Sequence, residues 1–181
     1  PATGLSTRGV DFLHRMDAMC EEAERRDVDL VIFAGDAFKT RSPNPTFQRE
    51  FAHRIRDLAE VAPVVLLIGN HDLPLTQMKA SSVEIYDTLA VPNVRVAADF
   101  ETWLQPTKRG PVVIGSAPYP LRGRILEQTS TSGMTIAETD ARNIRRLRDF
   151  ATPRIAATHL TALNEFGNRL LTFVLAAIAL A

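Results

Sequence analysis

Two short apolar runs, each followed at once by a glycine and polar side chains, constrain the fold of this chain more than any other feature. The runs and their continuations are residues 31–34 (Val-Ile-Phe-Ala) before Gly35-Asp36, and residues 63–68 (Pro-Val-Val-Leu-Leu-Ile) before Gly69-Asn70-His71-Asp72. Runs of this length are typical of strands that are buried on both faces of a sheet. In open α/β sheets, ligand sites collect at the carboxyl ends of such strands. The sequence therefore predicts that Asp36, Asn70 and His71 lie at one sheet edge.

The segments around these runs have helical periodicity. Apolar residues recur at helical spacing between Val10 and Ala23 and predict a helix over residues 8–26, and a second helix is predicted from Pro45 to the residues before Pro63. The order helix, strand, helix, strand predicts an α/β fold with parallel crossovers. Weaker signals predict the following elements: a short helix over 81–89, and strands over 94–96, 112–114 and 154–158.

Composition and charge exclude several classes of protein. The 181 residues carry 21 basic and 21 acidic side chains, so the net charge does not indicate a nucleic-acid or membrane-surface binder. The single cysteine, Cys20, cannot build a disulfide framework, which favours a reducing compartment, the cytoplasm. We expect no secretory signal, because neither a basic nor a long apolar segment stands at Pro1. The apolar stretch from Leu170 to Ala181 is shorter than the roughly 20 residues that cross a bilayer, so we expect no membrane span and read it as soluble core or a terminal helix.

The polar residues after the strands are suited to metal-assisted phosphate chemistry. A dinuclear site needs a bridging carboxylate and neutral oxygen or nitrogen donors; Asp36 can bridge, Asn70 offers an oxygen, and His159, at the end of the 154–158 strand, offers a nitrogen. A turn beside a metal leaves little room for a Cβ or requires a positive φ, which explains glycine at positions 35 and 69. His71 is placed to touch substrate, as a general acid or a charge that stabilises the transition state.

Each of these residues also has a purely structural interpretation. Gly35-Asp36 can be a simple turn, and residues 70–72 can form an Asx turn in which Asp72 caps a following helix. His159 can be an ordinary hydrogen-bonded histidine at a strand end. We assign His14 and His53 to the solvated surface, because both lie on predicted helices among charged neighbours.

Gly35-Asp36 and Gly69-Asn70-His71-Asp72 resemble the second and third signature blocks of the calcineurin-like metallophosphoesterases. The flanks, residues 28–38 and 41–43 with the helix to Arg56, resemble the nuclease subunit of the bacterial SbcCD double-strand-break repair complex, and residues 157–161 resemble its next histidine block. The resemblance covers roughly residues 1–161. It implies a two-layer β-sandwich flanked by helices (α/β/β/α), which binds two Mn²⁺ ions, with Mg²⁺ as the other suitable ion, and hydrolyses DNA phosphodiesters with metal-activated water.

The resemblance also implies a role for each matching residue. Asp36 would bridge the ions, Asn70 and His159 would bind the second ion, His71 would be the catalytic residue, and Asp72 would support its neighbours from behind. The implied partners are DNA and a coiled-coil ATPase subunit of the SbcC type, and the apolar tail is compatible with a homodimer.

Two signature blocks of that family have no counterpart in the sequence. An Asp-x-His block is expected upstream of Pro1, and a Gly-His-x-His block is expected after His159. We therefore expect a partial domain over 1–161, incomplete at both ends and weakly active or inactive, with the apolar tail 162–181 packed on it. Three interpretations follow: a DNA nuclease, a metallophosphatase or phosphodiesterase for another substrate class, and a metal-poor binding module.

Overall fold

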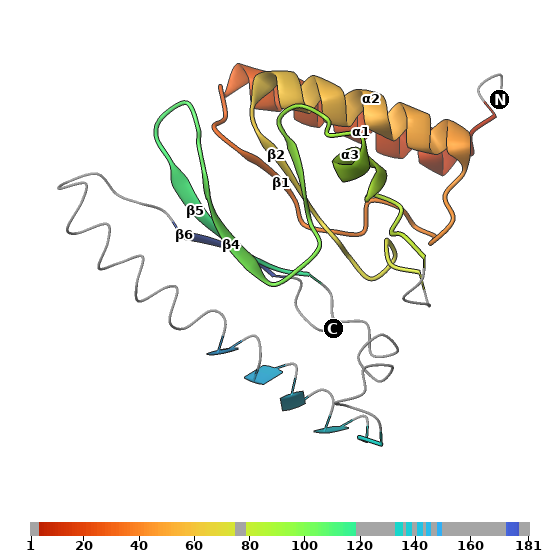
Figure 1. Ribbon diagram of the computed structural model, residues 1–181. Coiled ribbons are helices and arrows are strands. Elements are labelled where there is room, and N and C mark those ends of the chain that lie inside the picture. Colours follow the sequence, from red (N-terminus) through yellow and green to blue (C-terminus); the bar gives the residue numbers. More distant parts are fainter. Residues whose placement is uncertain are drawn as a thin grey trace.

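The computed structural model shows two sheets with a layer of helices on one side (Figure 1). The residues that it describes are 4–74, 79–118, 133–135, 137–138, 141–142, 144–145, 148–149 and 173–177. Helices α1 (Thr7–Arg25) and α2 (Pro45–Val61) cover the outer face of the first sheet, and the second sheet lies on its other face. This arrangement confirms the predicted α/β class and the sandwich of two sheets.

The first sheet is parallel, as the alternation of helices and strands predicts. Its strands are β1 (Val31–Phe33), β2 (Val64–Leu67) and β3 (Val94–Ala97), in that order across the sheet. All four residues of β2 are buried, whereas all three residues of β1 are only half-buried. The prediction of burial on both faces is therefore confirmed for the central strand, and it is wrong for β1, which lies at an edge of the described sheet.

The helices begin where side chains can satisfy their first N–H groups. The Ser6 hydroxyl accepts a hydrogen bond from the Gly9 N–H at 3.2 Å, and the Asn44 side chain accepts from the Thr46 N–H at 2.8 Å. Pro45 occupies the first helical position of α2, where its missing N–H costs nothing. Helix α3 (Ile85–Thr88) is shorter than predicted, because residues 82–84 form a turn instead.

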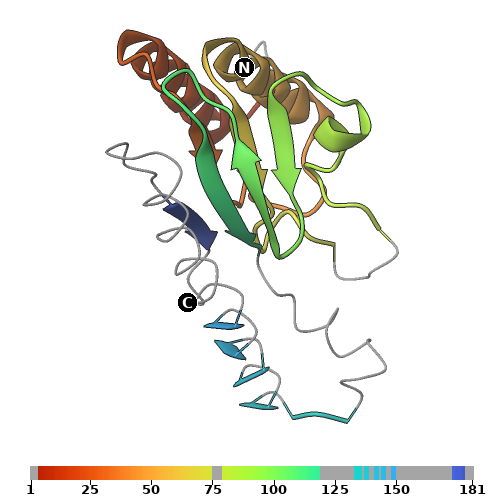
Figure 2. The same ribbon diagram turned by 60° about the vertical axis from the view of Figure 1, so that its left-hand side comes forward.

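The second sheet contains two strands that the sequence analysis did not identify. Strand β4 (Glu101–Gln105) pairs antiparallel with β5 (Val112–Ala117), and β5 pairs in parallel with β6 (Phe173–Ala177), the dark blue strand of Figure 2. The interpretation of the apolar tail as a terminal helix is therefore wrong for residues 173–177. These five apolar residues extend the second sheet instead.

Strand β2 separates two hydrophobic cores. Val64 and Leu66 pack in the core under α1 and α2, whereas Val65 and Leu67 pack in the core between the two sheets. This alternation follows from the two-residue period of a strand. The core under the helices is built around Phe51, which is fully buried. The central strand thus contributes to both hydrophobic cores, and these fix the position at which the loop after β2 begins.

The surface of the described residues agrees with one further expectation. His14 and His53 are both exposed. No helix in the described part of the chain has both the length and the apolar character needed to cross a bilayer.

Candidate functional site

The loops that follow β1 and β2 meet at the carboxyl end of the first sheet. Because β1 and β2 are parallel neighbours, Gly35-Asp36 and Gly69-Asn70-His71-Asp72 leave the sheet on the same side. The backbone N–H of His71 donates to Asp36 Oδ1 at 2.9 Å. The structure therefore brings the residues of both predicted motifs together. His159 and the predicted strand before it lie outside the described residues.

Glycine is needed at both strand ends, for a different reason at each. A Cβ added to Gly69 would lie 2.2 Å from the backbone nitrogen of Asp36 and 2.3 Å from Asp36 Oδ1. Gly35 has a φ of 97°, and Asp36 follows it with a φ of 55°. Gly69 thus allows the two loops to touch, and Gly35 allows the left-handed turn that directs the first loop toward the second.

The buried carboxylate of Asp72 connects the two loops by hydrogen bonds. Asp72 is completely buried; its Oδ2 accepts from the Gly69 N–H at 2.9 Å, and its Oδ1 accepts from the Phe38 N–H at 3.4 Å. Burial raises the pKa of this carboxyl, while the backbone N–H groups of Gly69, Ala37 and Phe38 oppose the rise. Among the described residues, the Asp72 carboxylate accepts hydrogen bonds from backbone groups that precede it in the chain.

The side chains of Asp36, Asn70 and His71 are accessible to a ligand. Asp36 and His71 are exposed, and Asn70 is half-buried. One oxygen of Asp36 is engaged by the His71 N–H, and a carboxylate has further lone pairs for a cation. Carboxylate and amide oxygens are the donors that Mg²⁺ and Mn²⁺ prefer. The donors present therefore fit a hard divalent ion in kind.

The number of donors is smaller than a two-ion site requires. Within the described residues, no group of three or more histidine, cysteine, aspartate or glutamate side chains is placed to hold a metal ion. One or two protein oxygens suffice for an ion that retains most of its water and also contacts a substrate phosphate. In kind and number, the side-chain oxygens of Asp36 and Asn70 match the protein share of the shell of one such ion.

Arg41 joins the same two loops, and the sequence analysis gave it no role. Its Nε donates to the main-chain oxygen of Leu73 at 2.8 Å, and the residue is otherwise exposed. A guanidinium is well suited to phosphate recognition. In the sequence, Arg41 stands out only as part of the flank 41–43 after Asp36, because its contact with Leu73 depends on how both loops fold.

Comparison with known families found a match over most of the chain. The sequence model described as calcineurin-like phosphoesterase matches residues 9–171, which include both loops.

Proposed function

The chain belongs to the calcineurin-like phosphoesterase family, and from this premise we propose that it hydrolyses DNA phosphodiesters as the nuclease subunit of an SbcCD-like repair complex. Enzymes of this family use divalent metal ions to hydrolyse phosphoesters. The observation that carries the proposal is the contact between the two loops, which places the carboxylate of Asp36 next to the Asn70-His71 segment.

The proposed roles follow from the position of each side chain. Asp36 and Asn70 would hold a divalent ion, which we propose to be Mn²⁺, and His159 is the proposed additional ligand. When bound, such an ion acts as a Lewis acid toward phosphoryl oxygens and acidifies water. The exposed imidazole of His71 would donate a proton to the leaving oxygen or neutralise charge on the phosphoryl group. Asp72 would keep both loops in position.

Two features favour DNA over a smaller phosphoester. The residues that flank Asp36, including Arg41, resemble those of the repair nucleases, and Arg41 adds a positive charge beside the loop that carries His71. The site is also open, because Asp36 and His71 are both exposed, as a polymeric substrate requires. We further propose a coiled-coil ATPase subunit of the SbcC type as the partner, and a homodimer as the form that binds it.

A substrate panel tests this proposal. The full chain is incubated with Mn²⁺ and, separately, with linear duplex DNA, single-stranded DNA, a nucleotide diester or a phosphopeptide. We expect slow fragmentation of DNA that a chelator stops and that Asp36→Asn abolishes. Asp11→Asn is the matched control, because it removes the same charge from an exposed position on α1.

The other outcomes separate the remaining interpretations. Faster hydrolysis of the nucleotide diester or the phosphopeptide than of DNA would favour a metallophosphoesterase of another substrate class. Absence of both hydrolysis and Mn²⁺ binding would favour a binding module and would refute the nuclease proposal.

A further inference from the structure

In the described part of the chain, strand β3 has an open edge on the side away from β2. Its pairing with β2 uses the main-chain oxygens of Asn93 and Ala97, which accept from Val64 and Ile68 at 2.7 and 3.3 Å. Because successive residues of a strand point their backbone groups to opposite sides, both backbone groups of Val96 point away from β2. Among the described strands, none pairs with this side of β3.

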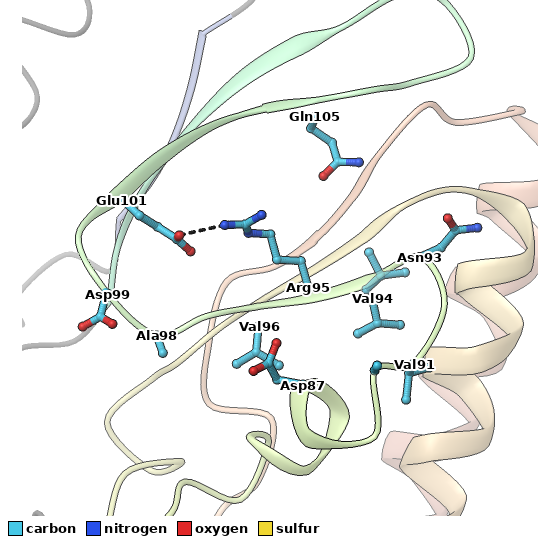
Figure 3. Close-up of a pocket in the computed structure, with 12 residues that line it drawn as sticks. Asp87, Val91, Asn93, Val94, Arg95, Val96, Ala98, Asp99, Glu101 and Gln105 are labelled. Atoms are coloured by element: carbon cyan, nitrogen blue, oxygen red, sulfur yellow. Dashed lines mark hydrogen bonds and ion pairs between the residues drawn. The ribbon is translucent and has the colours of Figure 1, made fainter.

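A groove with a volume of about 660 Å³ follows this edge (Figure 3). Helix α3 and the turn after it form one wall, with Asp87 and Val91, and strand β4 forms the other wall, with Glu101 and Gln105. A strand of four residues is about 13 Å long, so an extended segment of four or five residues matches the length of β3. We call it the β3 edge groove.

Among the described residues that line the groove, the charged groups without an ion-pair partner are carboxylates. Arg95 is the cation of the lining, and its guanidinium pairs with Glu101 at 2.7 Å and lies over the Trp103 ring at 4.2 Å from the centroid. The carboxylates of Asp87 and Asp99 also line the groove, and neither forms an ion pair with another described residue. Figure 3 shows Arg95 directed toward Glu101 and away from Asp87.

We propose that the β3 edge groove binds an extended segment of a partner protein that carries lysine or arginine side chains. The segment adds to the first sheet as a further strand: its backbone pairs with Val96, and its basic side chains reach Asp87 and Asp99. Charge complementarity favours this occupant over an acidic or purely apolar segment, because Arg95, the one basic side chain among the described residues that line the groove, is already paired with Glu101. Covering the edge would also remove an open strand that invites unspecific pairing.

The test uses Trp103, the single tryptophan of the chain, as a probe beside the groove. An acetylated hexapeptide of alternating lysine and valine is titrated into the full chain. We expect a saturable change in Trp103 fluorescence that weakens at high salt. A glutamate–valine hexapeptide, and the lysine–valine peptide with methylated valine nitrogens, are expected to give no such change.

Charge variants of the groove complete the test. Asp87→Asn and Asp99→Asn should each weaken binding by up to about fivefold, the size of one exposed charge pair, while Asp11→Asn on α1 should not. Equal binding of the acidic and basic peptides, undiminished binding of the methylated peptide, or unchanged binding in both groove variants would overturn the proposal. The comparison of peptides on the unaltered chain does not depend on how the variants fold.

Discussion

Replacing Gly69 with alanine is expected to separate the loops that carry Asp36 and Asn70. The added Cβ would lie 2.2 Å from the backbone nitrogen of Asp36 and 2.3 Å from its Oδ1, well inside the ordinary contact distance of about 3.5 Å. Because one of the two atoms belongs to the backbone, rotation of a side chain does not relieve the overlap. The loops must therefore move apart by about 1 Å.

The cost of this movement can be estimated from the contacts that it disturbs. Overpacking at a close contact costs about 1–3 kcal/mol. The movement also lengthens the hydrogen bond from His71 N–H to Asp36 and the bond from Gly69 N–H to Asp72, both 2.9 Å long, and bonds to carboxylates contribute about 1.5–3 kcal/mol each. With partial loss of both bonds, we expect the free energy of unfolding to fall by about 2–4 kcal/mol and Mn²⁺ binding to weaken.

Urea unfolding followed by circular dichroism, with calorimetric titration of Mn²⁺, measures both effects. Gly9→Ala is the matched control, because a Cβ there would lie 3.4 Å from Ser6 Oγ and 3.7 Å from the Phe47 ring, which are ordinary contacts. Within α1 this control should leave stability unchanged or raise it by about 0.5–1 kcal/mol. If Gly69→Ala unfolded at the wild-type urea concentration and bound Mn²⁺ as tightly as the wild type, the described contact between the loops would be wrong.

Three further predictions concern single side chains. Asp72→Ala leaves the N–H groups of Gly69 and Phe38 without their acceptor and should cost about 2–4 kcal/mol in urea unfolding; a change below about 0.5 kcal/mol would contradict the role of its carboxylate. Burial raises the pKa of Tyr86 to about 12 from an ordinary 10.0, so the stability that it contributes is complete below pH 10 and falls by about 2–3 kcal/mol between pH 10 and 12. Tyr86→Phe should lack this fall, and parallel stability curves for the two proteins over pH 9–12 would refute the assignment. His71→Asn should lower the rate of phosphodiester hydrolysis by about 100-fold or more without changing Mn²⁺ affinity, whereas lost affinity would make His71 a metal ligand.

The first sheet and its helices could be predicted from the sequence because local patterns determine them. The helical spacing of apolar residues before Val31 and between Pro45 and Pro63 predicts α1 and α2, and the two apolar runs predict β1 and β2. Strand β4 could not be found in this way, since the apolar residues of Glu101–Gln105 are adjacent and do not alternate with polar ones, and its described pairing is with β5. A run such as Phe173–Ala177 fits a helix or a strand equally well until a partner strand is known.

The location of the candidate site could also be predicted, but its internal support could not. Parallel order alone brings Asp36 and Asn70 to one sheet edge. That Asp72 would accept hydrogen bonds from two loops depends on the folded path of both loops, and so does the contact of Arg41 with Leu73. Such contacts between distant segments leave no periodic signal in the sequence.

Asp36 and Asn70 are inferred to bind the same metal ion, and a double-mutant cycle tests this directly. Mn²⁺ is titrated by calorimetry into the wild type, Asp36→Ala, Asn70→Ala and the double variant. If the two side chains share an ion, each single variant lowers the affinity for Mn²⁺. The affinity of the double variant is then only slightly lower than that of whichever single variant binds Mn²⁺ more weakly. Affinities unchanged in both single variants, or losses that simply add, would contradict a shared ion.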